Sequence, residues 1–415
     1  MKTIKQLFVG ALWLTVCLLC SGQLLAQVVS QQPAFMERAQ TQLENGVSVT
    51  VAVPSAAETK EYFGLSLYQK NVQPVWLDVT NEREIPVQFL PVGLDSWYYT
   101  PIESAMLGAG RKADASRVKR FEAEGMKIYI GPGERRSGFI FSRLDQGTKS
   151  FNVDFFARGN EHFGFTFFVP VPGLRMDHQD VDWDNLYSDE EIRDLDQAAL
   201  IETLQQLPCC TTDKGAKGTG DPLNLVVIGT PDDVYYSFLR AGWDETEVIS
   251  RGSLWRMGKA FVARSENRYS PVSGLYVFGR PQDVALQKAR DNIDERNHLR
   301  LWMSPYRYQG KPVWIGQISR DIGVRLTRKT ITTHKIDPDV DETREYLVEN
   351  LAYSQSLWKL GYVSGVGAAS RAEPRGNLTG DPYYTDGLRV VLWVTGEPVS
   401  FSDIQGLDWG AEPTR

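Results

Sequence analysis

The pattern of hydrophobic and polar positions changes about halfway along the chain. Before residue 176, short apolar runs rich in Val, Phe and Tyr are broken by Asn, Gly and Pro. Runs of this length and spacing are typical of antiparallel strands, and they predict an immunoglobulin-like β-sandwich over residues 46–175. The charged stretch 113–126 has a helical composition and predicts a helix inserted into this sandwich. The expected strands are VSVTVAV (47–53), FGLSLYQ (63–69), PVWLDVT (74–80), IPVQFLPV (85–92), SGFIFSRL (137–144), SFNVDFFAR (150–158) and FGFTFFVPVPG (163–173).

The second half of the chain alternates strand and helix patterns. Residues 176–206 form an acidic linker, in which Ser188 and Glu191 make a capping box and an apolar stripe predicts a helix over 189–206. Residues 207–396 then predict an α/β or α+β domain, followed by a loose tail at 397–415. The expected strands include NLVVIG (224–229), HLRLWMS (298–304), PVWIGQIS (312–319) and LRVVLWVT (388–395), and the expected helices are TPDDVYYSFLRAGW (230–243) and DPDVDETREYLVENLAYSQSLWKLG (337–361).

The first 26 residues have the anatomy of a secretory signal peptide. Lys2 and Lys5 precede an apolar run from Leu7 to Leu19, and small residues indicate cleavage after Ala26. The run is shorter than the roughly 20 residues that span a bilayer, and a retained anchor is the alternative. We therefore expect an exported protein, periplasmic or associated with the cell envelope, whose mature chain has no transmembrane span.

Length, composition and charge bound the class of protein. A chain of 415 residues with 42% hydrophobic and 23% charged residues is typical of a soluble protein with more than one domain. The formal net charge of −7 argues against a nucleic-acid partner. The sequence contains no Walker loop, H-E-x-x-H motif or strand-anchored G-x-G-x-x-G motif, so we expect no cofactor.

Two cysteines remain after the expected cleavage, Cys209 and Cys210, and they are adjacent. Neighbouring Cα atoms lie about 3.8 Å apart, below the usual disulfide separation of at least about 4.4 Å. A vicinal disulfide is therefore feasible but strained, and two free thiols are the alternative. Neither arrangement predicts a catalytic role, because the C-x-x-C spacing of redox and zinc sites is absent.

A histidine stands beside alternating aspartates in THKIDPDVDETREYL (333–347). The aspartates have the spacing of the first ligands of a calcium loop, but Glu342 and Val348 occupy the positions where that loop needs Gly and Glu. A helix that starts with Asp337 as its N-cap explains the pattern better. The weak candidates for a metal site are His334, Asp337 and Asp341.

The stretch RNHLRLWMSP (296–305) places His298 and Arg300 on one strand face, because side chains in a strand alternate with a period of two. Such a pair could bind an anion or supply an acid beside a cationic clamp. An exposed polar strand face is the alternative. The candidate ligand-binding residues are Arg296, His298, Arg300, Arg320 and Arg344.

The stretch QISRDIG (317–323) places Ser319 and Asp321 on one strand face and Arg320 on the other. Ser319 could be a nucleophile with His298 or His334 as its base, although no G-x-S-x-G elbow surrounds it. A structural ion-pair network is the alternative, since such networks resemble active sites. The candidate catalytic residues are His298, His334 and Asp321.

Several separate motifs resemble one family of bacterial domains. They are LPCCTTDKG, GDPLNLVVIG, AGWDETE, FGRPQDVALQKARDNIDERNHLRLW, VWIGQISRDIG and THKIDPDVDETREYL. Together they make residues 200–396 similar to the LssY C-terminal domain family, while the N-terminal region lies outside the resemblance. The family has no established reaction, so the resemblance implies domain boundaries and an envelope setting and assigns no catalytic role. It also implies that Cys209 and Cys210 belong to the loop that opens the domain.

Three functions fit these residues, and the sequence leaves open whether the chain is an enzyme. The first is an exported envelope protein of uncharacterised activity that binds an anionic envelope ligand or a protein partner. The alternative is a hydrolase of phosphate or acyl esters that uses a His/Arg/Asp cleft in the C-terminal domain. The third is a metal-dependent enzyme. An enzyme needs its histidines and an orienting acid around one pocket, whereas a binding module needs only an open basic groove or a sheet edge.

Overall fold

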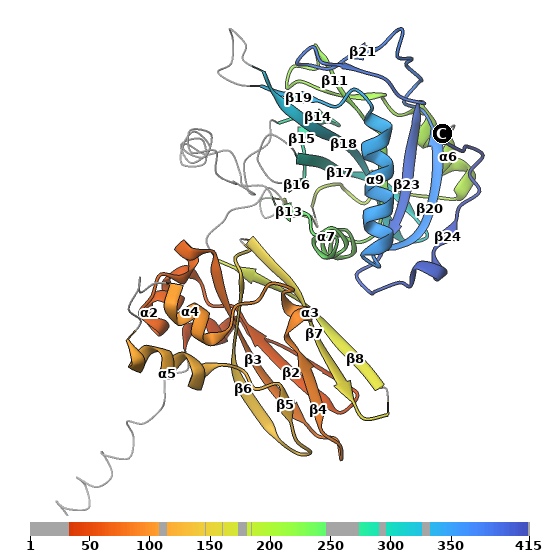
Figure 1. Cartoon of the computed structure of the whole chain (residues 1–415). Coiled ribbons are helices and arrows are strands. Elements are labelled where there is room, and N and C mark those ends of the chain that lie inside the picture. The colour runs from red at the N-terminus through yellow and green to blue at the C-terminus, as the bar shows by residue number, and fades with distance from the viewer. Residues whose placement is uncertain are drawn as a thin grey trace, which may run out of the picture.

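The structure is a computed structural model, and it describes residues 33–107, 114–145, 147–159, 161–172, 181–183, 185–245, 274–289, 296–325 and 333–413. Figure 1 shows these residues in two lobes, one built from the first half of the chain and one from the second. The hydrophobic clusters divide in the same way. Those of the first lobe lie between Phe35 and Val171, and those of the second between Leu200 and Trp409.

The first lobe contains two four-stranded antiparallel sheets whose inner faces share one core. Val49 of one sheet belongs to the same buried cluster as Phe155 and Phe167 of the other. Along the strands 47–52, 147–157 and 161–171, buried and more exposed positions alternate over most of the length, which is the pattern of a sheet covered on one face. The first sheet has the order β1 (Gln40–Glu44), β2 (Val47–Ala52), β3 (Val72–Asn81) and β6 (Arg135–Arg143), and the second has the order β5 (Tyr129–Ile130), β4 (Val87–Leu90), β7 (Gly147–Ala157) and β8 (Glu161–Val171).

Short helices cover the outer side of the first sheet, around a cluster that includes Phe63, Phe121 and Phe139. The predicted helical insertion is confirmed, because α5 (Ala115–Glu124) begins at its cap Asp114. The other helical segments are η1 (Ala34–Arg38), α2 (Ala56–Phe63), η2 (Leu67–Lys70), α3 (Pro91–Leu94) and α4 (Pro101–Leu107).

The strand expected at FGLSLYQ is wrong. Phe63 ends α2, and Gly64 adopts a left-handed conformation with φ of 70° that caps the helix. The following residues form η2, whose buried Leu67 packs into the same cluster as Phe63. The apolar positions of this run therefore belong to helical turns, which periodicity over so few residues cannot separate from a strand.

The second lobe is organised around a ten-stranded, mostly antiparallel sheet, in which β12 and β23 pair in parallel at the centre and β9 and β24 add short parallel pairs. The main path has the order β13 (Asp244–Glu245), β16 (Val284–Ala289), β17 (Arg296–Tyr308), β18 (Lys311–Arg325), β12 (Leu225–Ile228), β23 (Leu388–Val394), β20 (Leu357–Ser364) and β24 (Gln405–Gly406), while β19 (Thr333–Ile336) pairs with β18 and β9 (Arg193–Leu195) pairs with β17. Smaller strands form a four-stranded sheet, β11 (Thr219–Pro222), β10 (Cys210–Thr212), β14 (Tyr276–Val277) and β15 (Arg280–Pro281), and a pair, β21 (Arg375–Gly376) and β22 (Pro382–Tyr383).

Helices cover both faces of the large sheet. Val234 of α7 (Pro231–Arg240) and Leu347 of α9 (Val340–Tyr353) belong to the cluster on one face. Leu200 of α6 (Gln197–Gln206) belongs to the cluster on the other face, together with Val277 of the smaller sheet. The arrangement is a β-rich fold of several sheets, with helices on both faces of the largest one. It is compatible with the expected mixture of strands and helices in this half of the chain.

The linker helix expected over 189–206 starts later than predicted. Ser188 donates to Glu191 and closes a turn, but β9 follows, and α6 begins at Gln197 after its cap Asp196. Ser188 and Glu191 therefore bond to each other within a turn that does not continue as a helix, and the reciprocal bonds of a capping box do not form between them. Pairing of β9 with β17 places these residues on the sheet instead.

The helix expected over 337–361 is also shifted and shorter. Its cap is Asp339, whose side chain accepts from the Glu342 backbone, so Asp337 is not the N-cap. The helix ends at Tyr353, because Gln355 adopts a left-handed φ of 60°. Residues from Leu357 onward form β20.

The C-terminal tail is not loose as expected. Its strand β24 pairs with β20, and Trp409 is buried in the cluster beside α6.

The two lobes are also in contact. The ring of Phe168 in β8 stacks on Tyr236 in α7 with 4.0 Å between ring centroids, and the backbone amide of Thr148 donates to Glu245. Among the described helices, none combines the length and apolar character that a membrane span requires.

Candidate functional site

Two of the three candidate catalytic residues, His298 and Asp321, meet where β17 and β18 pair, whereas the side chain of the third, His334, lies outside the described residues. His298 lies directly opposite Ser319 in this antiparallel register. Opposite residues of such a pair project their side chains to the same face. Leu299 and Ile318, one position further along, point into the core beneath α7 and α9. The polar side chains therefore lie on the sheet face that carries α6.

Ser319, His298 and Asp321 form a connected series on this face. The Ser319 hydroxyl oxygen lies 3.0 Å from Nε2 of His298. The other ring nitrogen, Nδ1, lies 3.6 Å from Oδ2 of Asp321. That separation exceeds a normal hydrogen bond but is an ion-pair distance once the imidazole is protonated. All three side chains are buried, with Ser319 at 0% exposure and His298 at 7%.

Two buried arginines flank the series at either end. Arg296 donates from Nε to Oδ2 of Asp321 at 3.2 Å and from Nη1 to Gln287 at 2.6 Å. Arg300 donates to Gln317 at 2.9 Å, and the Gln317 amide in turn donates to the Ser319 hydroxyl at 2.7 Å.

A continuous polar chain thus runs from Arg300 through Gln317, Ser319 and His298 to Asp321 and Arg296. Both ends of this chain carry a guanidinium, which cannot lose its proton at physiological pH.

Burial governs the electrostatics of Asp321. Removal from water raises the pKa of its carboxyl from the ordinary 3.8 to about 7, although the positive charges of Arg296 and Arg300 act in the opposite direction. Burial also raises the pKa of Asp221, which accepts from the Asn377 amide and lies near Arg300. The carboxyl of Asp321 therefore changes charge near neutral pH, in contact with the imidazole that it orients.

This connectivity has the form of an activated nucleophile. A hydroxyl bonded to Nε2 can pass its proton to a neutral imidazole, and a carboxylate at Nδ1 favours the tautomer that accepts it. The order of contacts, oxygen to Nε2 and Nδ1 to carboxylate, is the order required of a nucleophile, a base and an orienting acid. A guanidinium near such a site can stabilise negative charge that develops on the substrate.

Residues 201–388 match the family model described as LssY C-terminus. This part of the chain is similar to the LssY C-terminus family. The match begins within α6 and ends at the start of β23, so the polar chain on β17 and β18 lies entirely inside it. The N-terminal region lies outside the match, as the sequence motifs predicted. No curated protein matches the chain.

Within residues 201–388, only three of the five predicted ligand-binding residues lie on the same face of the sheet. Arg320 points to the opposite side of β18 from Ser319, where it donates to Asn297 at 3.0 Å and lies 3.5 Å from Glu342. Its guanidinium also covers the ring of Tyr346 in α9. Arg296, His298 and Arg300 share one face, whereas Arg320 stabilises the contact between β18 and α9.

Arg344 belongs to a separate buried network of the LssY C-terminus segment. It forms a two-pronged ion pair with Asp386, at 2.8 and 2.9 Å, and lies 3.3 Å from Asp341. Asp341 also accepts from the Thr385 hydroxyl at 2.7 Å. These contacts fasten the start of α9 to the loop before β23. Arg344 is therefore a structural residue with no approach to the polar chain.

The two metal candidates with described side chains, Asp337 and Asp341, each have other partners. Asp341 is committed to Arg344 and Thr385, and Asp337 accepts from the backbone amide of Asp339. His334 lies in β19 with its backbone paired to Val324, and its side chain lies outside the described residues. Across the residues with described side chains, no group of three His, Cys, Asp or Glu side chains could hold a metal ion.

Sequence reasoning missed Gln287 and Asp221, which extend the polar face. Gln287 comes from β16 and is fully buried beside Arg296. A polar residue inside the otherwise apolar run of β16 was the available signal. Asp221 precedes Pro222 in β11, where the sequence reads as a loop, so no periodicity marked it.

The two cysteines of the LssY C-terminus segment are joined in a vicinal disulfide, with Cα atoms 3.7 Å apart. Arg389 of β23 donates to the carbonyl groups of Leu207 and Pro208, at 3.1 and 3.0 Å. The chain is therefore held at the start of β10 by the buried guanidinium as well as by the ring that the disulfide closes.

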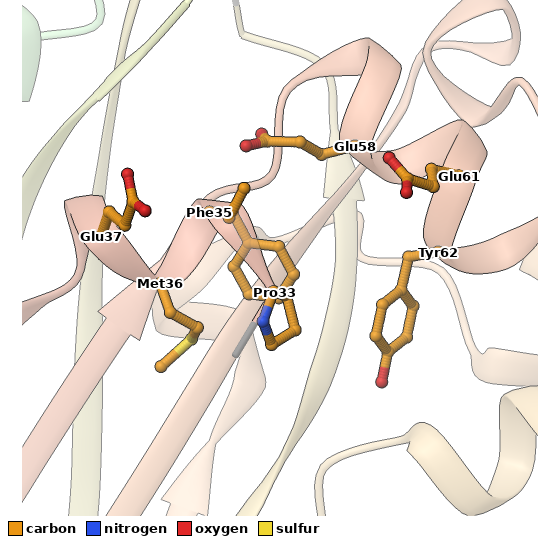
Figure 2. Close-up of a pocket in the computed structure, with 8 residues that line it drawn as sticks. Pro33, Phe35, Met36, Glu37, Glu58, Glu61 and Tyr62 are labelled. Carbon is orange, nitrogen blue, oxygen red and sulfur yellow. The ribbon is translucent and has the colours of Figure 1, made fainter. Parts of the chain in front are cut away.

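The first lobe contains a cavity of about 700 Å³ far from these residues in the sequence. Figure 2 shows Glu58, Glu61 and Tyr62 of α2 together with Phe35 of η1 around it. Glu58 is paired with Arg38 at 2.6 Å and takes part in the capping box of α2. Its carboxylate therefore already has a structural partner, and we assign the cavity no chemistry.

Proposed function

We propose that the C-terminal lobe is a hydrolase of phosphate or acyl esters in the bacterial envelope. The observation that carries this proposal is the series Ser319, His298 and Asp321, with contacts of 3.0 and 3.6 Å in the order that nucleophilic catalysis requires. Of the three functions that the sequence left open, a binding module needs no such series. An open basic groove is also not supported, because Arg320 and Arg344 lie away from Arg296 and Arg300.

In this proposal, Ser319 attacks the carbonyl carbon or phosphorus of the ester. His298 accepts the hydroxyl proton at Nε2 and then delivers it to the leaving alkoxide, so the ester bond breaks as the bond to Ser319 forms. A water molecule, deprotonated by the same imidazole, then releases the acid and regenerates the hydroxyl. Asp321 orients the ring and stabilises its protonated form.

The two arginines favour an anionic substrate. Arg300 reaches Ser319 through Gln317, and Arg296 is bound to the orienting carboxylate. Positive charge held on this face stabilises the negative charge that grows on the substrate oxygen during attack. Ser319 is fully buried, so the proposal requires the groups that bury it to move before a substrate can reach the hydroxyl. A small reactive probe detects that access directly.

The experiment is labelling with a small fluorophosphonate, followed by mass spectrometry of the digested protein. The proposal predicts a single adduct on Ser319, absent in Ser319→Ala and strongly slowed in His298→Ala. Ser304→Ala is the matched control, since Ser304 is an equally buried serine on β17 that bonds to the Val313 carbonyl. Absence of an adduct on folded protein, or equal labelling of Ser319→Ala, would rule the hydrolase out.

A binding module for an anionic envelope ligand is the second candidate. The observation in its favour is that Arg296 and Arg300 lie on the same buried face with His298. A pure binding role predicts that Ser319→Ala keeps its affinity for inorganic phosphate while Arg300→Ala loses it, with no turnover in either. In both proposals the protein is exported to the envelope, and the N-terminal lobe acts as an immunoglobulin-like interaction module.

A further inference from the structure

Ser319 has a buried arginine of β17 on either side of it. His298 lies directly opposite Ser319 in the register of β17 and β18. Arg296 and Arg300 stand two positions before and after His298, so they share its face and lie diagonally across from Ser319. Diagonal neighbours of this kind are about 7–8 Å apart, which is within reach of a long side chain.

The neighbouring strands supply neutral partners for these two arginines. Arg296 donates to the side-chain oxygen of Gln287 at 2.6 Å, and Arg300 donates to that of Gln317 at 2.9 Å. An amide oxygen orients a guanidinium without cancelling its charge. In β16, the residue opposite Arg300 is the small Ala285, which takes little space beside the guanidinium.

Burial disfavours the ionised forms of the carboxyls that oppose this positive charge. Asp321 and Asp221 both lie within reach of the Arg300 charge, and removal from water raises the pKa of each, to about 7 for Asp321. The guanidiniums keep their protons over the same range. An anionic ligand can therefore supply part of the counter-charge that these carboxyls supply only at a cost.

The backbone around Ser319 is used by the sheet. Acyl-transfer sites commonly hold the oxygen of their intermediate with backbone N–H groups. Here the amide of Ile318 donates to the side chain of Asn224 at 3.0 Å. Successive amides of a strand point to opposite edges, so the amide of Ser319 points to β17, where His298 is its partner. Beside Ser319, stabilisation of negative charge therefore falls to side chains, and the cationic ones in the described part of the chain are Arg296 and Arg300.

We propose that this site hydrolyses phosphate monoesters, with the dianionic phosphoryl group held between Arg296 and Arg300. This inference rests on the proposed hydrolase and selects one of its two substrate classes. The phosphoryl group spreads its negative charge over three oxygens in the transition state, and guanidiniums bind such oxygens in pairs. An acyl ester is neutral before attack and develops charge on one oxygen, so it would use a pair of flanking arginines poorly.

The two steps balance without any further reactant than water. In the first, the Ser319 oxygen bonds to phosphorus as the bond from phosphorus to the alcohol oxygen breaks, and the serine proton passes through His298 to the alcohol. In the second, a water molecule deprotonated by His298 attacks the phosphoserine. The same proton then returns to the Ser319 oxygen as inorganic phosphate is released.

The experiment compares p-nitrophenyl phosphate, bis(p-nitrophenyl) phosphate and p-nitrophenyl acetate, with each rate divided by that of the uncatalysed reaction. We expect the largest acceleration for the monoester and competitive inhibition by orthovanadate, which resembles the phosphoryl group during transfer. Arg300→Lys keeps the charge but loses the planar fork, and it should lower kcat/KM for the monoester by about 10²–10³-fold. Its effect on the acetate should be less than about tenfold, because the acetate carries no phosphoryl oxygens for the fork to bind.

Arg320→Lys is the matched control. Arg320 is the neighbour of Ser319 on the same strand, but its side chain lies on the other face, where it donates to Asn297 at 3.0 Å. The control should treat all three substrates as the wild-type protein does.

The outcomes separate this inference from the hydrolase itself. Folded protein that gives no fluorophosphonate adduct on Ser319 would remove the hydrolase and this inference with it. An adduct on Ser319 combined with a larger acceleration of the acetate or the diester would leave a hydrolase and overturn the monoester assignment. If Arg300→Lys does not fold, the wild-type protein decides, because orthovanadate should protect Ser319 from the fluorophosphonate. Equal labelling with and without orthovanadate would overturn the assignment.

Discussion

The hydroxyl oxygen of Ser319 lies 3.0 Å from Nε2 of His298, on adjacent strands whose register places the two residues directly opposite each other. Strand pairing therefore fixes the contact, and no loop has to close to form it. Sites built on strands of a sheet hold their geometry more closely than sites built on loops. The proposed chemistry requires the groups that bury Ser319 to move aside.

Replacing His298 by alanine tests the assigned base. We expect hydrolysis of p-nitrophenyl esters or phosphates to fall by about 10²–10⁴-fold in kcat, because the serine proton loses its acceptor. KM should change little, since the imidazole contributes to the reacting geometry more than to ground-state binding. Thermal melting should show a folded protein. Loss of the fold instead would assign His298 to a structural network.

The pH dependence should follow Asp321. Burial raises the pKa of its carboxyl to about 7, so the carboxylate that orients His298 forms only as pH rises through that value. We expect kcat/KM to increase from pH 6 to pH 8 with an apparent pKa of about 7. The control is Asp321→Asn, which should be about 10²–10⁴-fold less active and should lack this limb of the profile. An identical limb in the variant would place the titration on another group.

Stability should change with pH in the opposite direction. The unfolded chain loses the Asp321 proton near 3.8, whereas the folded protein holds it to about 7, so the folded state binds more protons between these values. The stabilisation is therefore greatest at low pH and is lost as pH rises through about 7, at up to about 1.4 kcal/mol per pH unit. Melting temperatures between pH 5 and pH 8 should show this fall. Asp321→Asn should give a flatter profile, because the amide does not titrate over this range.

Arg344→Met should destabilise the protein strongly. It removes the guanidinium that balances Asp341 and Asp386 and leaves two carboxylates in a largely buried network, at a cost of about 3–5 kcal/mol. Arg371→Met is the matched control, because Arg371 is 77% exposed and lies 3.7 Å from Asp339, and it should change stability by less than about 0.5 kcal/mol. Urea denaturation of both variants measures the difference. Similar midpoints would show that the buried network is dispensable.

The adjacent cysteines should be resistant to alkylation in the folded and in the denatured protein until a reductant is added. Mass spectrometry of the purified chain should give a mass about 2 Da below that of the dithiol, because closing the bond removes two hydrogen atoms. We expect Cys209→Ser with Cys210→Ser to retain labelling of Ser319, since the disulfide lies outside the polar chain. Alkylation of both thiols without reductant would show that they are free.

The sequence located most elements of both halves, and the failures have identifiable causes. The strands β17, β18 and β23 and the helix α7 were predicted from apolar runs and a Thr cap. The expected strand at FGLSLYQ and the early start of the linker helix were wrong, because a local pattern fits a turn and a regular element equally well. Tertiary pairing, such as that of β9 with β17, decided between them.

The site shows the same division. Alternation alone placed Ser319 with Asp321 on one face and Arg320 on the other, and the structure confirms this arrangement. Alternation within one strand does not show that β17 and β18 are neighbours, in a register that sets His298 opposite Ser319. It also does not show that Gln287 of β16 bonds to Arg296.

The sequence by itself determined the resemblance of the second half to the LssY C-terminus family and the residues that share each strand face, because these depend on motifs and on a period of two. It also predicts an export signal from composition alone. Only the tertiary structure decided which arginines stand beside His298. Arg296 and Arg300 share its strand face, whereas Arg344 lies on a helix held by Asp386. The physical reason is that strand order and register are fixed by long-range packing and hydrogen bonding between segments far apart in the chain. Residue spacing within one segment contains no information about either.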